Sequence, residues 1–195
     1  MAALPASQFA LVATVGTSFR SILIYALSAT VALIVVHWLA RAAAPRAQRA
    51  DRQPWTAWER LVYAGVLSAV GVLAASAFGA IGKGETMSGW PLMLHMVGAG
   101  VFTVALPALA VTWSAVHLRA NRVANGARFS LLARAMFWAL LLSGLAVMGT
   151  MLVSMLPWLG THELEEMLDA HRFAGLAVVI VLLLHAYAVL TGRRR

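Results

Sequence analysis

Five long runs without Asp, Glu, Lys or Arg limit what this chain can fold into. They cover residues 21–40, 61–82, 86–118, 135–162 and 173–192. Each run is close to, or longer than, the roughly 20 residues that a helix needs to cross a bilayer. The chain is 62% hydrophobic and 11% charged, whereas a soluble domain carries about a quarter charged residues. The sequence therefore predicts an all-α membrane protein with five transmembrane helices, and it excludes a soluble enzyme, a disordered chain and a disulfide scaffold.

The sequence contains no cysteine. Thiolate zinc sites, cysteine-ligated iron–sulfur clusters, catalytic thiols and disulfides are therefore excluded from this chain. Any metal must be held by histidine, methionine or oxygen ligands.

Arginines gather at alternate ends of the runs. They lie in the first loop and its flanks, in the third loop and in the C-terminal tail: Arg41, Arg46, Arg49, Arg52, Arg60, Arg119, Arg122, Arg128, Arg134, Arg193, Arg194 and Arg195. The acidic residues of the opposite ends are Glu85, Glu163, Glu165, Glu166 and Asp169. The positive-inside rule predicts an N-terminus outside and a C-terminus in the cytoplasm of a bacterial inner membrane. The net charge of +8 thus reflects topology, and no basic stripe interleaved with aromatic residues indicates a nucleic-acid partner.

The chain has two parts of different composition. Residues 1–57 contain the first run and the arginine-rich loop after it, and residues 58–195 contain the other four runs. The segment before the first run lacks the basic start of a signal peptide, so we expect an uncleaved first helix. The predicted organisation is one N-terminal transmembrane helix followed by a four-helix bundle.

Histidine is the only strongly ionisable residue type well inside the runs, and ionisable residues within a membrane are functional candidates. His171 and His185 are 14 residues apart. At about 100° and about 1.5 Å per residue, they share a helix face and lie about 21 Å apart along it. A haem macrocycle ligated by one histidine from each of two helices suits this spacing, whereas zinc or copper needs three or four ligands at one depth. We therefore expect haem b, with two haems stacked along this face.

Depth in the membrane selects the partners of these two histidines. His95 lies near the outer end of the third run and should face His171 across an outer haem. For His185 at the inner end we favour His37 of the first run over His117, because His117 lies about 33 Å beyond His95 along a straight helix. For each histidine, a plain hydrogen bond to a neighbouring helix is the alternative.

Residues near these histidines have more than one interpretation. Arg172 is placed to pair with a haem propionate, and a snorkelling interfacial charge is the alternative. Gly98 and Gly175 give room beside a macrocycle or serve ordinary helix packing. His162 is predicted to lie in a solvated acidic loop before the fifth helix.

Several segments are similar to one protein family. They are residues 91–98 (PLMLHMVG), 132–138 (LARAMFW), 155–157 (MLP), 171–174 (HRFA) and 184–187 (LHAY). From about residue 58 onward, the chain resembles the four-helix membrane cytochrome b subunits of formate dehydrogenase, thiosulfate reductase and related nickel hydrogenases. The resemblance implies that His95, His171 and His185 are haem ligands, and that the chain passes electrons between a redox partner and quinone.

The resemblance breaks down at one position. The family's remaining ligand follows an arginine by three residues at the start of the first bundle helix, where this chain has Tyr63 after Arg60. Either His37 or His117 supplies the missing ligand, or only one haem binds.

The sequence thus favours an electron-transfer subunit over a stand-alone enzyme. A quinone is expected near the inner haem, with Tyr63, Arg134 and Tyr187 as candidates to hold its oxygens. A periplasmic or cytoplasmic redox protein or dehydrogenase subunit is the expected partner, because the chain has no nucleotide-binding glycine loop. The alternatives are a haem-free membrane anchor of a redox complex and a small metal or proton transporter, which the lack of acidic residues within the runs disfavours.

Overall fold

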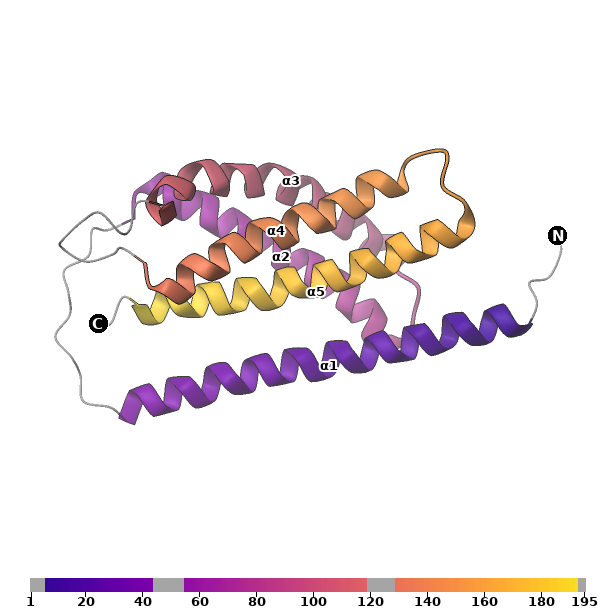
Figure 1. The fold of residues 1–195 in the computed structure, drawn as a ribbon, viewed down its shortest axis with the longest axis horizontal. Helices are drawn as coiled ribbons and strands as arrows, with labels where there is room; N and C mark the ends of the chain where they lie inside the picture. The colour runs from indigo at the N-terminus through magenta and orange to yellow at the C-terminus, as the bar shows by residue number, and fades with distance from the viewer. Residues whose placement is uncertain (1–5, 44–54, 119–128, 193–195) are drawn as a thin grey trace. The chain divides into compact units, whose positions relative to one another are not determined.

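The computed structural model describes residues 6–43, 55–118 and 129–192, with side chains from residue 18 onward. It contains five helices within these ranges: α1 (Ala6–Ala43), α2 (Ala57–Lys83), α3 (Gly89–Leu118), α4 (Leu131–Ser154) and α5 (Thr161–Gly192) (Figure 1). All five are long and apolar enough to cross a membrane. The predicted fold class is therefore confirmed, and the chain is a multi-pass membrane protein with five candidate spans.

The chain divides into two compact units, Met1–Ala44 and Pro45–Arg195. The predicted domain boundary after residue 57 stays a prediction, since residues 44–54 lie outside the described ranges. Most of the arginines behind the topology prediction also lie outside the described residues: Arg46, Arg49, Arg52, Arg119, Arg122, Arg128, Arg193, Arg194 and Arg195. The first unit consists of α1, whose candidate span is Ser18–Ala43.

The second unit is built from two helical hairpins. Helix α2 packs along α3, and α4 packs along α5, while the two hairpins meet over a smaller area (Figure 1). The start of α2 is fixed by a capping box, in which Thr56 Oγ1 accepts from Glu59 N at 3.2 Å and Glu59 Oε2 accepts from Thr56 N at 2.8 Å. Its end is fixed by Gly84, whose φ of 73° suits a residue without a side chain.

The boundary between the fourth and fifth helices differs from the sequence expectation. The uncharged run 135–162 does not form one helix, because α4 ends at Ser154 and a turn containing Pro157 precedes α5. Helix α5 begins at Thr161 with acidic residues in its first turns, where negative charge stabilises the helix dipole. His162 therefore lies in the first turn of α5 rather than in a loop, and His171 lies about 15 Å into the helix rather than at its start.

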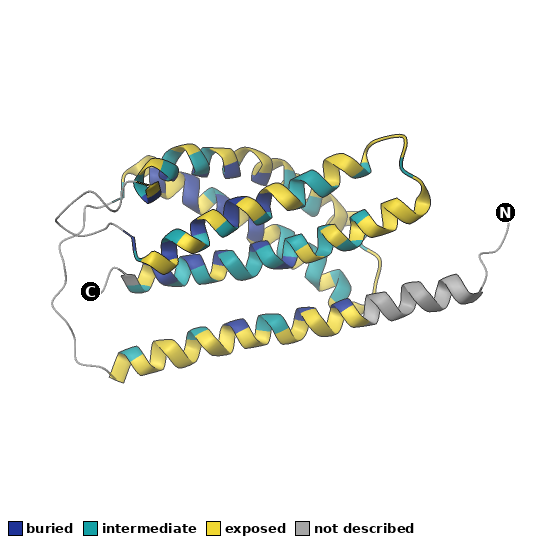
Figure 2. Ribbon diagram, viewed as in Figure 1, coloured by how far each residue is buried: buried dark blue, intermediate teal, exposed yellow. Residues whose placement is uncertain are grey.

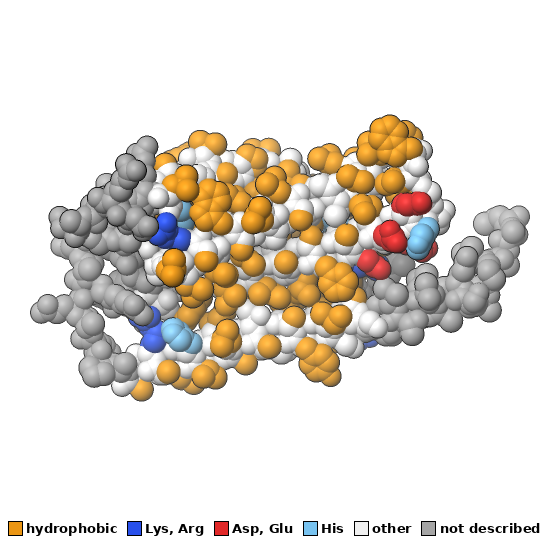
Figure 3. Space-filling view, viewed as in Figure 1, with side chains coloured by type: hydrophobic (Ala, Val, Ile, Leu, Met, Phe, Trp, Pro, Cys, Tyr) orange, Lys and Arg blue, Asp and Glu red, His pale blue; other side chains and the backbone are white. Residues whose placement is uncertain are grey.

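Buried residues concentrate in one half of the four-helix unit. They lie in the first halves of α2 and α4 and toward the ends of α3 and α5, which the antiparallel hairpins bring to the same end of the bundle (Figure 2). Trp113, Phe137, Leu109 and Leu140 are fully buried there. The opposite half, where α5 begins, is packed more openly. Apolar side chains cover the flanks of the molecule, and acidic ones gather at the end where α5 begins (Figure 3).

Candidate cofactor site

Helices α3 and α5 each carry two histidines, and the structure brings these into two pairs. The ring centres of His95 and His171 are 6.5 Å apart, with an angle of 68° between the ring planes. The ring centres of His117 and His185 are 6.3 Å apart, with an angle of 38°. Both pairs join the α2–α3 hairpin to the α4–α5 hairpin, and we call them the outer pair (His95 and His171) and the inner pair (His117 and His185).

The outer pair is half-buried, and oxygens of the neighbouring helices hold both rings. Nδ1 of His95 lies 3.1 Å from Ser76 Oγ of α2. Nδ1 of His171 lies 3.1 Å from Thr150 Oγ1 and 3.1 Å from the Val147 carbonyl oxygen, both on α4. Each imidazole is thus fixed through Nδ1, which leaves Nε2 as its second ring nitrogen.

The inner pair is fully buried, and both its histidines are 0% exposed. The carbonyl oxygen of Trp113 lies 2.8 Å from Nδ1 of His117, and the Tyr63 hydroxyl lies 3.1 Å from Nδ1 of His185. Among the described residues, no donor or acceptor lies within hydrogen-bond distance of His185 Nε2. A buried imidazole nitrogen of this kind is costly unless something binds it.

Aromatic rings enclose the inner pair. Phe137 stacks on His117 with 4.0 Å between ring centres, and Phe129 stacks on it at 4.5 Å. Trp113 lies 5.9 Å from both histidine rings. A large flat ligand could reach this pair only if these rings shifted, whereas the outer pair lies in the open half of the bundle.

The donor set of both pairs fits a metal held by two imidazoles. Two rings that bind one metal from opposite sides, with bonds of about 2 Å, have centres about 6 Å apart. The ring-centre separations of 6.5 and 6.3 Å are close to this distance. A hydrogen bond from Nδ1 to a protein oxygen is the usual support of a metal-bound histidine. In the described part of the chain, no group of three or more His, Asp or Glu side chains could hold a metal ion.

The remaining predicted residues lie as follows. His37 is on α1, in the other compact unit, so its pairing with His185 stays a prediction. Arg172 pairs with Asp169 of the same helix at 2.7 Å, and its contact with a propionate also stays a prediction. His162 is exposed and lies 3.3 Å from Glu166.

The two glycines near the outer histidines face helices. A methyl group at Gly98 would lie 3.2 Å from the Leu73 side chain of α2, and one at Gly175 would lie 4.0 Å from Val147 of α4. Gly98 thus serves the close packing of α2 on α3.

The three candidates for quinone binding have different surroundings. Tyr63 is buried and bonds to His185. Arg134 donates from Nε to the His117 carbonyl oxygen at 2.9 Å, at the last turn of α3. Tyr187 is half-buried on α5. No quinone contact follows from these positions alone, so the quinone site stays a prediction.

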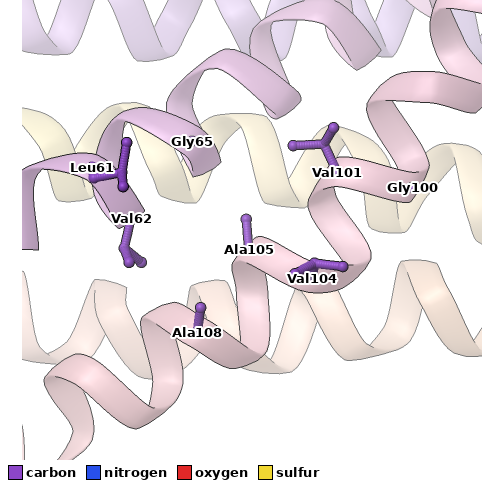
Figure 4. A pocket seen from close by; sticks show the side chains of 8 residues that line it. All are labelled: Leu61, Val62, Gly65, Gly100, Val101, Val104, Ala105 and Ala108. Carbon is purple, nitrogen blue, oxygen red and sulfur yellow. The ribbon is translucent and has the colours of Figure 1, made fainter. Parts of the chain in front are cut away.

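A shallow groove of about 460 Å³ lies on the α2–α3 hairpin (Figure 4). Its lining is entirely apolar: Leu61, Val62, Gly65, Gly100, Val101, Val104, Ala105 and Ala108. It contains no polar side chain that could take part in chemistry, and the histidines do not line it.

Sequence reasoning missed Ser76 and Thr150, because single hydroxyl residues are common in membrane helices. Their similar spacing is a weak signal that could have found them: Ser76 lies 19 residues before His95, and Thr150 lies 21 residues before His171. The contact of Tyr63 with His185 had a partial signal, because the resemblance expects a haem ligand at this position.

Comparison with protein-family models, with curated protein sequences and with solved structures gives no match for this chain.

Proposed function

We propose that this chain is a membrane b-type cytochrome, an electron-transfer subunit that passes electrons between a redox partner and quinone. The observation that carries the proposal is the outer pair. Two imidazoles from different hairpins lie 6.5 Å apart inside a candidate membrane bundle, and each is held through Nδ1 by a protein oxygen. The resemblance to membrane cytochrome b subunits points to the same ligands.

His95 and His171 would hold the outer haem through Nε2. Bound there, haem b would supply a one-electron iron couple at a depth that soluble reductants do not reach. The residues around the pair would orient the two imidazoles. Ser76 and the Val147 carbonyl oxygen bond to Nδ1 of His95 and His171, and the helices would exclude water from the haem. Arg172, close to this pair in sequence, is the candidate to neutralise a propionate once its bond to Asp169 opens.

A second haem is proposed at His185. The geometry favours His117 as its partner, because their ring centres are 6.3 Å apart. The pairing of His185 with His37, which the depth argument from the sequence favours, is the alternative. Quinone is proposed to bind near this inner site, where Tyr63, Arg134 and Tyr187 surround the end of the bundle.

The proposed orientation follows the arginine distribution. The N-terminus and the acidic start of α5 would face outside, and the C-terminus would face the cytoplasm of a bacterial inner membrane. A soluble redox protein or dehydrogenase subunit would be the partner on one side, and a catalytic domain would belong to that partner.

Visible spectroscopy of the purified protein in detergent tests the proposal. We expect reduced-minus-oxidised spectra of low-spin haem b, with two haems per chain by pyridine haemochrome. His95→Ala and His171→Ala should each abolish one haem, while His162→Ala, at an exposed histidine of the same helix as His171, should retain both. A wild-type protein that binds no haem when haem is supplied would refute the proposal, and the haem-free anchor or the transporter would then remain.

A further inference from the structure

The same arrangement of a hydroxyl and a histidine occurs in both hairpins. In the first hairpin, Ser76 of α2 bonds to His95 of α3, and in the second, Thr150 of α4 bonds to His171 of α5. We infer that Ser76 and Thr150 are positioning residues, which fix the proton on Nδ1 of the outer histidines and thereby present both Nε2 lone pairs to one ligand between the hairpins. As an account of metal ligation this rests on the proposed function, but the protonation of the rings can be measured without any ligand.

The protonation of His95 follows from the bonds of Ser76. A serine hydroxyl has one proton to donate. Ser76 Oγ lies 2.8 Å from the Val72 carbonyl oxygen and 3.1 Å from that of Leu73, and both can only accept. Its proton is therefore directed to its own helix, so that Oγ accepts from His95 Nδ1–H at 3.1 Å. In a neutral imidazole with a proton on Nδ1, Nε2 has the free lone pair.

The protonation of His171 follows from two acceptors. The Val147 carbonyl oxygen, 3.1 Å from Nδ1, can only accept, so Nδ1 must donate. Thr150 Oγ1 donates its own proton to the same carbonyl at 2.9 Å and therefore accepts from Nδ1 at 3.1 Å. His171 thus has the same tautomer as His95.

The two hairpins match in detail. Ser76 bonds to the carbonyl three residues before it, and Thr150 does the same. Each hairpin therefore orients its own imidazole. A hydroxyl of its first helix, α2 or α4, bonds to the histidine of its second helix, α3 or α5.

Nitrogen NMR of the haem-free protein tests the inference directly. With ¹⁵N-labelled histidine, we expect His95 and His171 to show a protonated Nδ1 and an unprotonated Nε2. Ser76→Ala should shift His95 toward a mixture of tautomers, and Ser76→Thr, which keeps the hydroxyl, should restore the wild-type signal. The matched control is Ser143→Ala, because Ser143 bonds only to its own helix carbonyls at 2.8 and 3.3 Å among the described residues.

Haem titration of the same variants separates the inference from the proposed function. Loss of a residue that hydrogen-bonds to a metal-binding histidine commonly weakens metal affinity about 10–100-fold. We therefore expect Ser76→Ala and Thr150→Val to lower the haem affinity of the outer site by at least about tenfold. Thr150→Ser and Ser143→Ala should bind as the wild type does. The effect of Thr150→Val should be the smaller of the two, because His171 keeps its 3.1 Å bond to Val147.

Each outcome decides a different point. Protonated Nε2 in the wild-type rings, or an equal response of His95 to Ser76→Ala and Ser143→Ala, would overturn the inference whether or not haem binds. The expected tautomers in a protein that binds no haem would support the positioning role and refute the proposed function. Expected tautomers with unchanged haem affinity in all variants would overturn the role of the two hydroxyls in ligation.

Discussion

Gly144 of α4 packs against Leu106 and Phe102 of α3, in the other hairpin, and Gly144→Ala should drive the two hairpins apart. A methyl group there would lie 2.6 Å from Leu106 Cδ2 and 3.3 Å from Phe102 Cζ, whereas non-bonded carbons pack at about 3.5–4.0 Å. Leu106 and Phe102 are each 2% exposed, so neither side chain has free space to move into. Overpacking of this kind costs about 1–3 kcal/mol, and we expect the free energy of unfolding to be lower by that amount than in a Gly→Ala variant of the same helix without a clash.

The assay is denaturant unfolding of the purified protein in detergent micelles, followed by circular dichroism. Gly149→Ala on the same helix is the control, because no heavy atom of the described residues lies within 4 Å of a methyl group there. Replacing glycine by alanine inside a helix is itself stabilising by about 1 kcal/mol. The difference between the two variants therefore isolates the clash.

A double variant gives the result that would refute this reasoning. Leu106→Ala alone should cost about 2–5 kcal/mol by opening a cavity. In Gly144→Ala with Leu106→Ala, the new methyl group enters that cavity, so the loss should be smaller than the sum of the single losses by about 0.5–3 kcal/mol. Additive losses, or a Gly144→Ala protein as stable as Gly149→Ala, would show that the hairpins do not meet at Gly144.

Three further predictions concern the inner half of the bundle. Tyr63→Phe should lower the free energy of unfolding by about 1–3 kcal/mol, because the buried His185 ring loses its only hydrogen-bond partner among the described residues; an unchanged denaturation midpoint would contradict this. Thr56→Ala should cost about 1 kcal/mol by removing the cap of α2, and Thr56→Asp, which keeps an acceptor, should restore most of it in the same assay. His117→Ala should reduce the haem content from two to one while His37→Ala leaves it at two; the reverse result would favour the His37 pairing.

The number and type of the helices could be predicted because length and hydropathy decide whether a segment crosses a bilayer. The start of α5 could not, because the turn before it is uncharged and reads as part of a span, whereas the resemblance already indicates that the fourth helix ends near residues 155–157. Pro157 was the available signal, and the acidic residues after it belong to the first turns of a helix. Absence of charge predicts membrane compatibility, and it does not by itself predict where a helix ends.

The meeting of His95 with His171 could be predicted from depth, because both lie near the same ends of parallel helices. The contact of His117 with His185 was the less favoured expectation, because straight helices place the histidines about 33 Å apart on α3 and about 21 Å apart on α5. The structure nevertheless gives both pairs similar ring separations, which helices tilted relative to one another allow. Helix tilt depends on how the helices pack against each other, and this packing cannot be derived from the spacing of residues along the sequence.

The uneven packing of the bundle explains how both ends can have different roles. In the inner half, Trp113 and Phe137 fill the space between the hairpins and hold them together. In the outer half, each hairpin orients its own histidine through a hydroxyl of the neighbouring helix, so the imidazoles do not depend on each other for their orientation. We therefore expect a flat ligand to enter between the hairpins more easily at the outer ends than at the inner ends, because each outer imidazole keeps its own hydroxyl bond when the hairpins move apart. Gly144 and Leu106 lie between the two halves, and a substitution there should consequently affect the outer pair through hairpin spacing while leaving the Ser76 and Thr150 hydrogen bonds in place.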